Sequence, residues 1–143
     1  MARTTGYHSS VLFEVGQLYV RRHLHDKYGG QRQGGISTPM RFPVVLLFTG
    51  GGEKWGYRDR WDEDGTFRFS GEGQHGNMEF RAGNAAIRDH AANGKQLHLF
   101  EADGFGHARY FGQLAYAGHE LVPNVPDGSG GRRTAIVFRL ERR

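Results

Sequence analysis

The sequence contains no cysteine among its 143 residues. This absence excludes a disulfide-stabilised scaffold, a zinc site built on thiolates and a cysteine nucleophile. Long apolar runs are also missing, because the longest one, residues 44–48, is far shorter than the ~20 residues that cross a bilayer. The N-terminus lacks the basic and then apolar segments of a secretory leader. We therefore expect a cytoplasmic protein that makes no membrane contact.

Familiar catalytic and cofactor-binding signatures are absent as well. The sequence has no HExxH, GxSxG, Walker or dinucleotide-binding glycine motif. Residues 62–65 (DEDG) resemble the start of a calcium loop, but no carboxylate follows at the distance needed to close one. From the residues we expect no cofactor, no metal site and no catalysis.

Glycine and arginine are over-represented instead. Glycine supplies 23 of the 143 residues, more than twice the usual share of about 7%. Of the 19 basic residues, all but three are arginine, and the formal net charge is +4. Glycine permits tight turns and the close approach of a backbone to a partner. Arginine forms bidentate bonds with phosphate or carboxylate, although a biased genome composition produces the same skew.

Short strands separated by glycine-rich turns are predicted for most of the chain. The apolar patterns predict strands over residues 11–20, 42–48, 54–61, 66–70, 78–81, 96–101, 108–117 and 134–140. We expect a short helix over 21–28 and a second over 83–93, with Asn84 as its N-cap. Residues 1–10 are polar and aperiodic, which predicts a disordered leader before a single domain over 11–143. The fold class is therefore mainly β (α+β), as a small, strongly bent sheet or barrel.

Aromatic residues and arginines are concentrated between residues 55 and 73. Alternation places four residues of the first predicted strand on one face: Trp55, Tyr57, Asp59 and Trp61. Phe67 and Phe69 share one face of the next strand, after a hairpin turn at Asp64-Gly65. These rings either fill the interior of a barrel or clamp a planar base, which aromatic stacking stabilises by about 1–3 kcal/mol per base.

Two glycine-rich loops flank this aromatic segment in the sequence. The first glycine loop, residues 29–35, carries Gln31, Arg32 and Gln33 between glycine pairs, and the second glycine loop, residues 71–76, carries Gln74 and His75. Glutamine and arginine side chains bond base edges, and arginine also bonds phosphates. Each loop alone is equally consistent with a flexible surface turn. Together with the aromatic residues, they predict a flat pocket between two polar fingers, which is typical of nucleic-acid binding.

Several segments follow one another in the order of a known family. Residues 28–37 (YGGQRQGGIS) include GGI (34–36), which resembles the loop before its second strand. Residues 56–59 (GYRD) resemble its G-Y-E-D segment, and residues 67–73 (FRFSGEG) its F-x-Y-T-G-x-G strand and loop. Through most of its length the chain thus resembles the SRA domain, a modified-cytosine reader of the PUA-like superfamily. The first of these segments is most similar to the variant found in actinobacterial McrA-type HNH restriction endonucleases.

The resemblance implies a crescent-shaped β-barrel, with one or two short helices, that flips a modified base out of double-stranded DNA. The base then stacks between two aromatic rings, here Tyr57 and Phe69, with Trp55 and Trp61 as further pocket candidates. Ser70 stands at the family's threonine position, beside the 5-methyl group. A carboxylate should accept a hydrogen bond from the cytosine amino group. The family's acidic position is Arg60 in this sequence, so that either Asp59 or Asp62 must serve.

The resemblance also implies DNA contacts from both glycine loops. Gln31 or Arg32 would fill the space that the flipped base leaves, and Gln74 or His75 would enter the second groove. The full set of loop and strand residues expected to contact DNA is Gln31, Arg32, Gln33, Ser37, Arg58, Arg60, Gln74 and His75.

From the sequence we therefore expect a non-catalytic reader of 5-methylcytosine in double-stranded DNA, associated with the nucleoid when bound. The 5-hydroxymethyl base is a second candidate ligand. The family's nuclease module is not found in this sequence, so that a separate nuclease or effector protein is a candidate partner. Three alternatives stay open: a PUA-like reader of modified RNA, a small base-modifying hydrolase that uses Asp59 or Asp62 in the same pocket, and a barrel that binds a small planar ligand.

Overall fold

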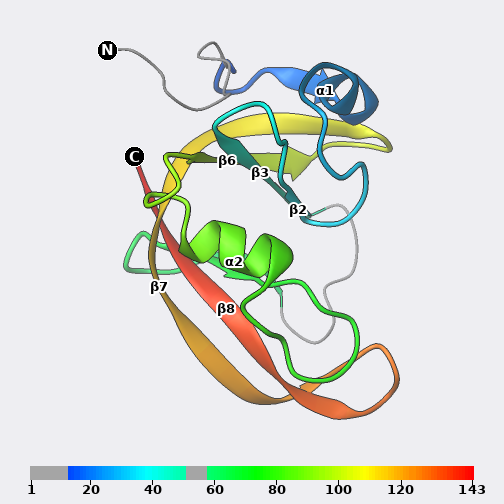
Figure 1. The fold of residues 1–143 in the computed structure, drawn as a ribbon, viewed down its shortest axis with the longest axis vertical. Helices are drawn as coiled ribbons and strands as arrows, with labels where there is room; N and C mark the ends of the chain where they lie inside the picture. The colour runs from blue at the N-terminus through cyan, green and yellow to red at the C-terminus, as the bar shows by residue number, and fades with distance from the viewer. Residues whose placement is uncertain (1–12, 51–57) are drawn as a thin grey trace.

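A computed structural model describes residues 13–50 and 58–143 of the chain (Figure 1). Its elements, in chain order, are β1 (Leu18–Val20), α1 (Arg21–Tyr28), β2 (Ile36–Ser37), β3 (Val44–Thr49), β4 (Arg60–Trp61), β5 (Phe67–Ser70), α2 (Ala82–Arg88), β6 (Gln96–Ala102), β7 (His107–Pro126) and β8 (Arg132–Arg142). In this part of the chain, no helix is long and apolar enough to cross a membrane.

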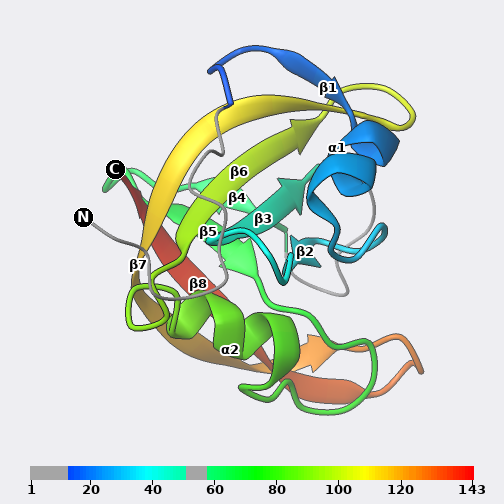
Figure 2. The ribbon, with the colours of Figure 1, turned by 45° about the horizontal axis from the view of Figure 1, so that its top comes forward.

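The strands form one strongly curved sheet in the order β2-β3-β6-β7-β8-β5-β4, and β1 pairs with the start of β7. The pair of β3 and β6 is parallel, and the other pairs are antiparallel. The long strands β7 and β8 sweep across the whole molecule (Figures 1 and 2). Their register shifts near Gly118, and shifts of this kind bend and twist a strand. The predicted mainly β, α+β fold is confirmed, as a crescent whose two outer strands, β2 and β4, do not meet.

Strand β3 divides the core into two clusters, because all six of its residues are buried. Val45 and Leu47 face a cluster that includes Phe69, Phe138 and Ile87 of α2. The alternate residues of β3 face a second cluster under α1, which includes Val44, Leu46, Phe48, Leu24, Tyr28 and Phe100. A strand that is covered on both faces reads as a continuous apolar run, which is why this strand could be predicted from the sequence.

Several predicted elements differ from the observed ones. In the described part of the strand predicted over residues 11–20, strand begins only at Leu18, because a turn closed by the bond from Gln17 N to Glu14 O at 3.0 Å precedes it. Residues 78–81 form no strand, because only the backbone of Met78 bonds to β8, through Thr134 O at 3.0 Å. Helix α2 is shorter than predicted, and its N-cap is Arg81 rather than Asn84. Strand β7 extends to Pro126, nine residues beyond the predicted end at residue 117, because β8 pairs with it along that length.

Candidate functional site

A cleft of about 640 Å³ opens between the two glycine loops. Its walls come from residues 32–36, residues 70–74 and the tip of the β6–β7 hairpin at residues 104–106, together with Arg21 and Phe48. The loops after α1 and β5 and the tips of both long hairpins lie along the same side of the molecule in both views (Figures 1 and 2). The structure therefore brings the two glycine loops predicted from the sequence to the same cleft.

One wall of the cleft is built around Arg21, the first residue of α1. Its backbone N–H donates to Gly106 O at 2.9 Å, which joins the helix to the β6–β7 hairpin. The guanidinium carbon lies 3.8 Å from the centre of the Phe48 ring, and Nε donates to His25 Nε2 at 3.0 Å. Within the described residues, no carboxylate pairs with Arg21, and burial lowers the pKa of its guanidinium.

His25 holds Arg21 as a neutral imidazole. Its Nε2 accepts from Arg21, so that Nδ1 carries the proton and donates to Gly29 O at 2.9 Å. The side chain is 2% exposed, and burial is the main cause that lowers its pKa. The positive charges of Arg21 and Arg32 lower this pKa further, while the bond to Gly29 acts in the opposite direction. The ring is therefore uncharged at neutral pH and can accept a hydrogen bond from the Arg21 Nε–H.

The second glycine loop is fastened to α2 by the buried Asn84 side chain. Asn84 Oδ1 accepts from Glu72 N at 2.8 Å, and Nδ2 donates to Glu72 O and Glu79 O, both at 2.9 Å. Asn84 is thus a loop anchor within the helix, where the sequence analysis predicted an N-cap.

The same loop is also fastened to the turn between β7 and β8. The Asp127 carboxylate accepts from Gly76 N at 2.9 Å, from Gly131 N at 3.0 Å and from the backbone and hydroxyl of Ser129. These bonds hold the pKa of Asp127 well below its usual range, the bond from Gly76 most strongly. Arg133 Nη1 donates to Gly73 O at 2.9 Å and to Gly76 O at 3.0 Å. The second glycine loop is therefore held from two sides.

The predicted base pocket is only partly described. Trp55 and Tyr57 lie outside the described residues. Phe69 has no exposed area and packs in the core with Phe67, at 6.4 Å between ring centres. Trp61 also packs inward, against Phe67 and Phe111. Of the two sequence-predicted rings, the structure thus describes one, in a buried position.

Asp59 and Ser70 lie together at the edge of this pocket. Asp59 Oδ1 accepts from Ser70 N at 2.8 Å, and Oδ2 accepts from Thr49 Oγ1 at 2.6 Å. The carboxylate therefore links the end of β3 to the end of β5. Ser70 is buried and forms part of the cleft wall.

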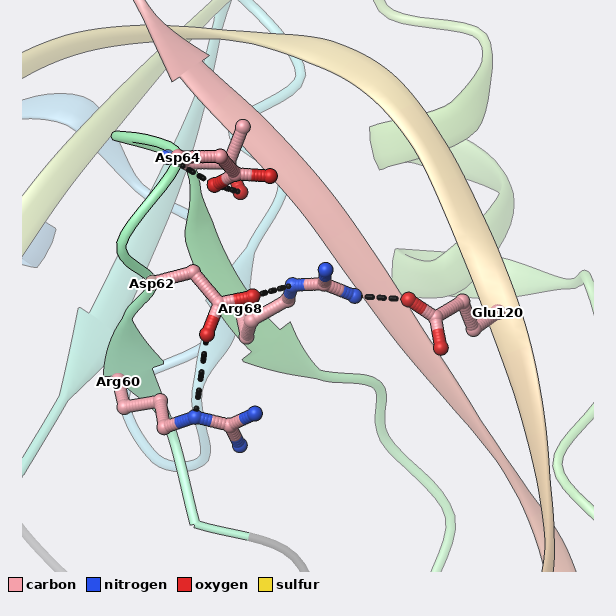
Figure 3. Close-up of polar contacts among 6 residues, drawn as sticks. Arg60, Asp62, Asp64, Arg68 and Glu120 are labelled. Atoms are coloured by element: carbon pink, nitrogen blue, oxygen red, sulfur yellow. Dashed lines mark hydrogen bonds and ion pairs between the residues drawn. The ribbon is translucent and has the colours of Figure 1, made fainter.

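Asp62, the other candidate carboxylate, belongs to an ionic network on the β4–β5 hairpin (Figure 3). It lies 2.8 Å from Arg68 Nε and 3.4 Å from Arg60 Nε, and Arg68 also pairs with Glu120 of β7. The hydrogen bond with Glu120 is the main cause that raises the pKa of Arg68. Asp62 is not part of the cleft wall. The structure therefore separates the two carboxylates that the sequence left as alternatives.

The predicted DNA-contacting residues divide into three groups. Arg32, Gln33 and Gln74 form part of the cleft wall and are exposed. Gln31 bonds Thr38 through its Oε1, and Ser37 has no exposed area. The remaining three are exposed but lie away from the cleft wall: Arg58, Arg60 and His75. His75 borders a separate, smaller cavity of about 390 Å³.

Phe105, Arg21 and His25 belong to this site but were missed by the sequence analysis. Phe105 is fully exposed, at 101% relative accessibility, and stands between two glycines with positive φ at the tip of the β6–β7 hairpin. Its sequence signal is an aromatic residue between glycines, DGFGH. For Arg21 and His25 the signal is their i, i+4 spacing, which places two side chains side by side on a helix.

Comparison with known proteins gives one family and several similar structures. Residues 15–142 match the family described as "ScoMcrA-like, SRA domain". No curated protein sequence matches. A structure of the sulfur binding domain and SRA domain of ScoMcrA, complexed with phosphorothioated DNA, is 17% identical, with a TM-score of 0.73 over 92% of this chain and 40% of that one.

Two further similar structures are DNA-recognition proteins as well. The SRA domain of SUVH5 in complex with fully methylated CG DNA is 20% identical, with a TM-score of 0.67 over 99% of this chain and 95% of that one. The DNA modification-dependent restriction endonuclease AspBHI is 19% identical, with a TM-score of 0.61 over 83% of this chain and 36% of that one. At these identities the likeness concerns the fold. The chain spans less than half the length of the ScoMcrA and AspBHI chains.

Proposed function

The chain belongs to the family of ScoMcrA-like SRA domains, as the sequence resemblance indicated, and from this we propose that it is a non-catalytic reader of 5-methylcytosine in double-stranded DNA. The modified base would leave the duplex and enter the cleft between the two glycine loops. Structurally similar SRA domains are bound to methylated or phosphorothioated DNA. A separate nuclease or effector protein is the partner we propose for such a reader.

The cleft is the observation that carries this proposal. Its volume of about 640 Å³ falls within the roughly 300–1,000 Å³ typical of small-molecule sites, so a nucleotide can enter it. Arg32, Gln33 and Gln74 on its walls offer donors and acceptors for base edges and phosphates. Arg21 adds a positive charge that no carboxylate of the described residues neutralises.

Asp59 is the better candidate for the contact with the cytosine amino group. Asp59 accepts from the backbone N–H of Ser70, which forms part of the cleft wall, so its carboxylate lies next to the cleft. Asp62 is held between two arginines and lies away from the cleft wall. The proposal also requires the Phe69 ring, which is buried, to become accessible when DNA binds.

A binding titration tests this function. Wild-type protein is titrated by fluorescence anisotropy with one duplex in four forms: unmodified, 5-methylcytosine, 5-hydroxymethylcytosine and phosphorothioate. We expect at least about tenfold tighter binding to the 5-methyl duplex, because each tenfold preference corresponds to only ~1.4 kcal/mol. A 2-aminopurine placed beside the methylated base should brighten on binding if that base leaves the stack. Equal affinity for the unmodified and methylated duplexes would overturn the proposal.

A matched pair of variants assigns the carboxylate. Asp59→Asn should reduce the preference for the methylated duplex, because the amide presents a donor where the cytosine amino group needs an acceptor. Asp62→Asn removes the same charge from the same hairpin and should leave the preference unchanged. The reverse pattern would move the base contact to Asp62. Tyr57→Ala should also remove the preference if that ring stacks on the base.

The other functions left open by the sequence are separated by two further measurements. In the first, single-stranded RNA competes with the methylated duplex for the protein. Displacement of the duplex by the RNA would favour a reader of RNA. Mass spectrometry of modified DNA after long incubation with the protein would reveal base release or strand cleavage. Either product would show that the protein is a hydrolase that uses the same pocket, and would overturn the assignment as a reader.

A further inference from the structure

Arg21 differs from the arginines of this domain that form close ion pairs. Arg32, Arg68, Arg88 and Arg109 each pair with a carboxylate within 3 Å. The neighbours of Arg21, at 3.0–3.8 Å, are the Phe48 ring, the His25 imidazole and the Gln31 carbonyl, all of them uncharged. Burial of a cation without an anion is unfavourable, and the lowered pKa of Arg21 expresses this cost. A bound anion would relieve it.

The contacts of Arg21 also fix the direction from which an anion can approach. The Phe48 ring lies against the guanidinium, and His25 accepts the hydrogen bond from its Nε–H. Nη2 makes one long bond of 3.4 Å to Gln31 O. Of the five N–H donors of arginine, those on Nη1 make no bond to the described residues. Arg21 belongs to the cleft wall, so an anion in the cleft can meet these donors edge-on.

We propose that Arg21 binds a backbone phosphate of the DNA strand that supplies the flipped base, and that His25 is the positioning residue that orients its guanidinium. The proposal rests on the proposed function, because it takes DNA as the occupant of the cleft. A phosphate matches the planar guanidinium through two parallel hydrogen bonds. The backbone bond from Arg21 N to Gly106 O fixes the start of the helix, so the contact is built before DNA arrives.

Arg21 and Arg22 form a matched pair for the test, because Arg22 is the next residue, carries the same charge and is exposed. Affinity is measured for methylated and unmodified duplexes over a range of salt concentrations. Arg21→Ala should lower the affinity for both duplexes by about tenfold or more, as expected for a charged hydrogen bond. It should also reduce the magnitude of the slope of log affinity against log salt by about one. Arg22→Ala should change affinity by less than about threefold. Equal effects of the two substitutions would overturn the phosphate contact.

His25 and His23 form a second pair, because His23 lies exposed on the same helix. His25→Leu fills the buried position with an apolar side chain that cannot accept a hydrogen bond from Arg21. This variant should therefore lose DNA affinity and salt dependence as Arg21→Ala does. His25→Gln offers an amide oxygen as acceptor and should restore both. His23→Leu should change neither. Thermal unfolding of each variant identifies loss of fold, and a folded His25→Leu variant with wild-type affinity and slope would contradict the positioning role.

The two proposals fail in different ways. If the wild type binds methylated and unmodified duplexes equally but Arg21→Ala still loses affinity and salt slope, the reader function fails and the phosphate contact stands. If the wild type prefers the methylated duplex and Arg21→Ala matches Arg22→Ala, the contact fails and the reader function stands.

Discussion

The two glycine loops have similar compositions and line the same cleft, but they are attached to the fold in different ways. Residues buried in the fold hold the second glycine loop, through the side chains of Asn84, Asp127 and Arg133. The first glycine loop is tied to the fold at its two ends, where Gly29 bonds His25 and Gly35 bonds Phe48. Its tip is held near the surface, by the bonds of Gln31 to Thr38 and the exposed ion pair of Arg32 with Asp26. Both segments are loops by composition, and the side chains that hold them show that the second one is the more firmly attached to buried residues.

This difference predicts a division of roles between the loops. Substitutions that detach the second glycine loop should lower the stability of the whole domain, since its anchors also join α2 and the β7–β8 turn. Substitutions at the side-chain tips of the first glycine loop should act on DNA affinity with little effect on stability. Four predictions test this division.

Asn84→Ala should have the largest effect. It leaves three backbone groups of Glu72 and Glu79 without their partner at a site where Asn84 is 2% exposed. We expect a loss of about 3 kcal/mol in the free energy of unfolding, measured by urea denaturation. Asn93→Ala, at an exposed position just after α2, is the control and should change stability by less than about 0.5 kcal/mol. Equal losses would mean that the anchor is dispensable.

Asp127→Asn should destabilise the domain in a pH-dependent way, by less than Asn84→Ala. The folded-state pKa of Asp127 is lowered, chiefly by the bond from Gly76, so its contribution is present above the unfolded pKa of about 4 and is lost as pH falls through the folded value. The stability difference between wild type and variant should therefore shrink from about pH 7 to about pH 3. A difference that stays constant over this range would contradict the role of the carboxylate charge.

Gly30→Ala tests the close approach of the first glycine loop's backbone to Ser37. Gly30 and Gly34 both have positive φ, but only at Gly30 would a Cβ overlap another atom, Ser37 Oγ. We expect a loss of about 2 kcal/mol for Gly30→Ala and about 1 kcal/mol for Gly34→Ala, because the second substitution adds only backbone strain. Thermal unfolding measures both. A Gly34 variant less stable than the Gly30 variant would show that the clash is relieved.

Arg32→Ala should have the smallest effect on stability. Its ion pair with Asp26 is more than half exposed on both sides, and such pairs contribute ~0.5 kcal/mol or less. Affinity for DNA should fall, because Arg32 belongs to the cleft wall. Arg88→Ala removes a similar exposed pair, with Asp89, at a position outside that wall. It should cause a similarly small loss of stability and no comparable loss of affinity. A parallel loss of affinity in both variants would indicate a general charge effect.

Local sequence patterns were sufficient for much of the fold. The apolar run of β3, the hairpin turn at Asp64-Gly65 and the short helix α1 all lie where the sequence places them. Each of these elements is specified by neighbours along the chain. The strand predicted over residues 78–81 was wrong because pairing depends on a distant partner, and β8 bonds only to Met78 there.

The site was predictable to the extent that its parts are loops. The glycine content located the two loops that form the cleft walls. The position of Arg21 beside the β6–β7 hairpin could not be predicted in this way. It depends on the pairing of β1 with β7, which joins segments almost ninety residues apart. Asn84 illustrates the same limit. An asparagine at a helix start is typical of an N-cap, but here its amide serves a loop twelve residues earlier in the sequence.

The position of β8 determines when the cleft can form during folding. Among the described strands, β5 pairs with β4 and β8, so the β4–β5 hairpin joins the sheet through β8. The backbone of β8 also bonds Gly71, Asn77 and Met78 around the second glycine loop. On the ribosome, the strands before β8 emerge earlier, and contacts of such large sequence separation form slowly. We therefore expect the wall formed by the second glycine loop to take its place only after β8 has joined the sheet, so that a ligand of the cleft binds the folded domain.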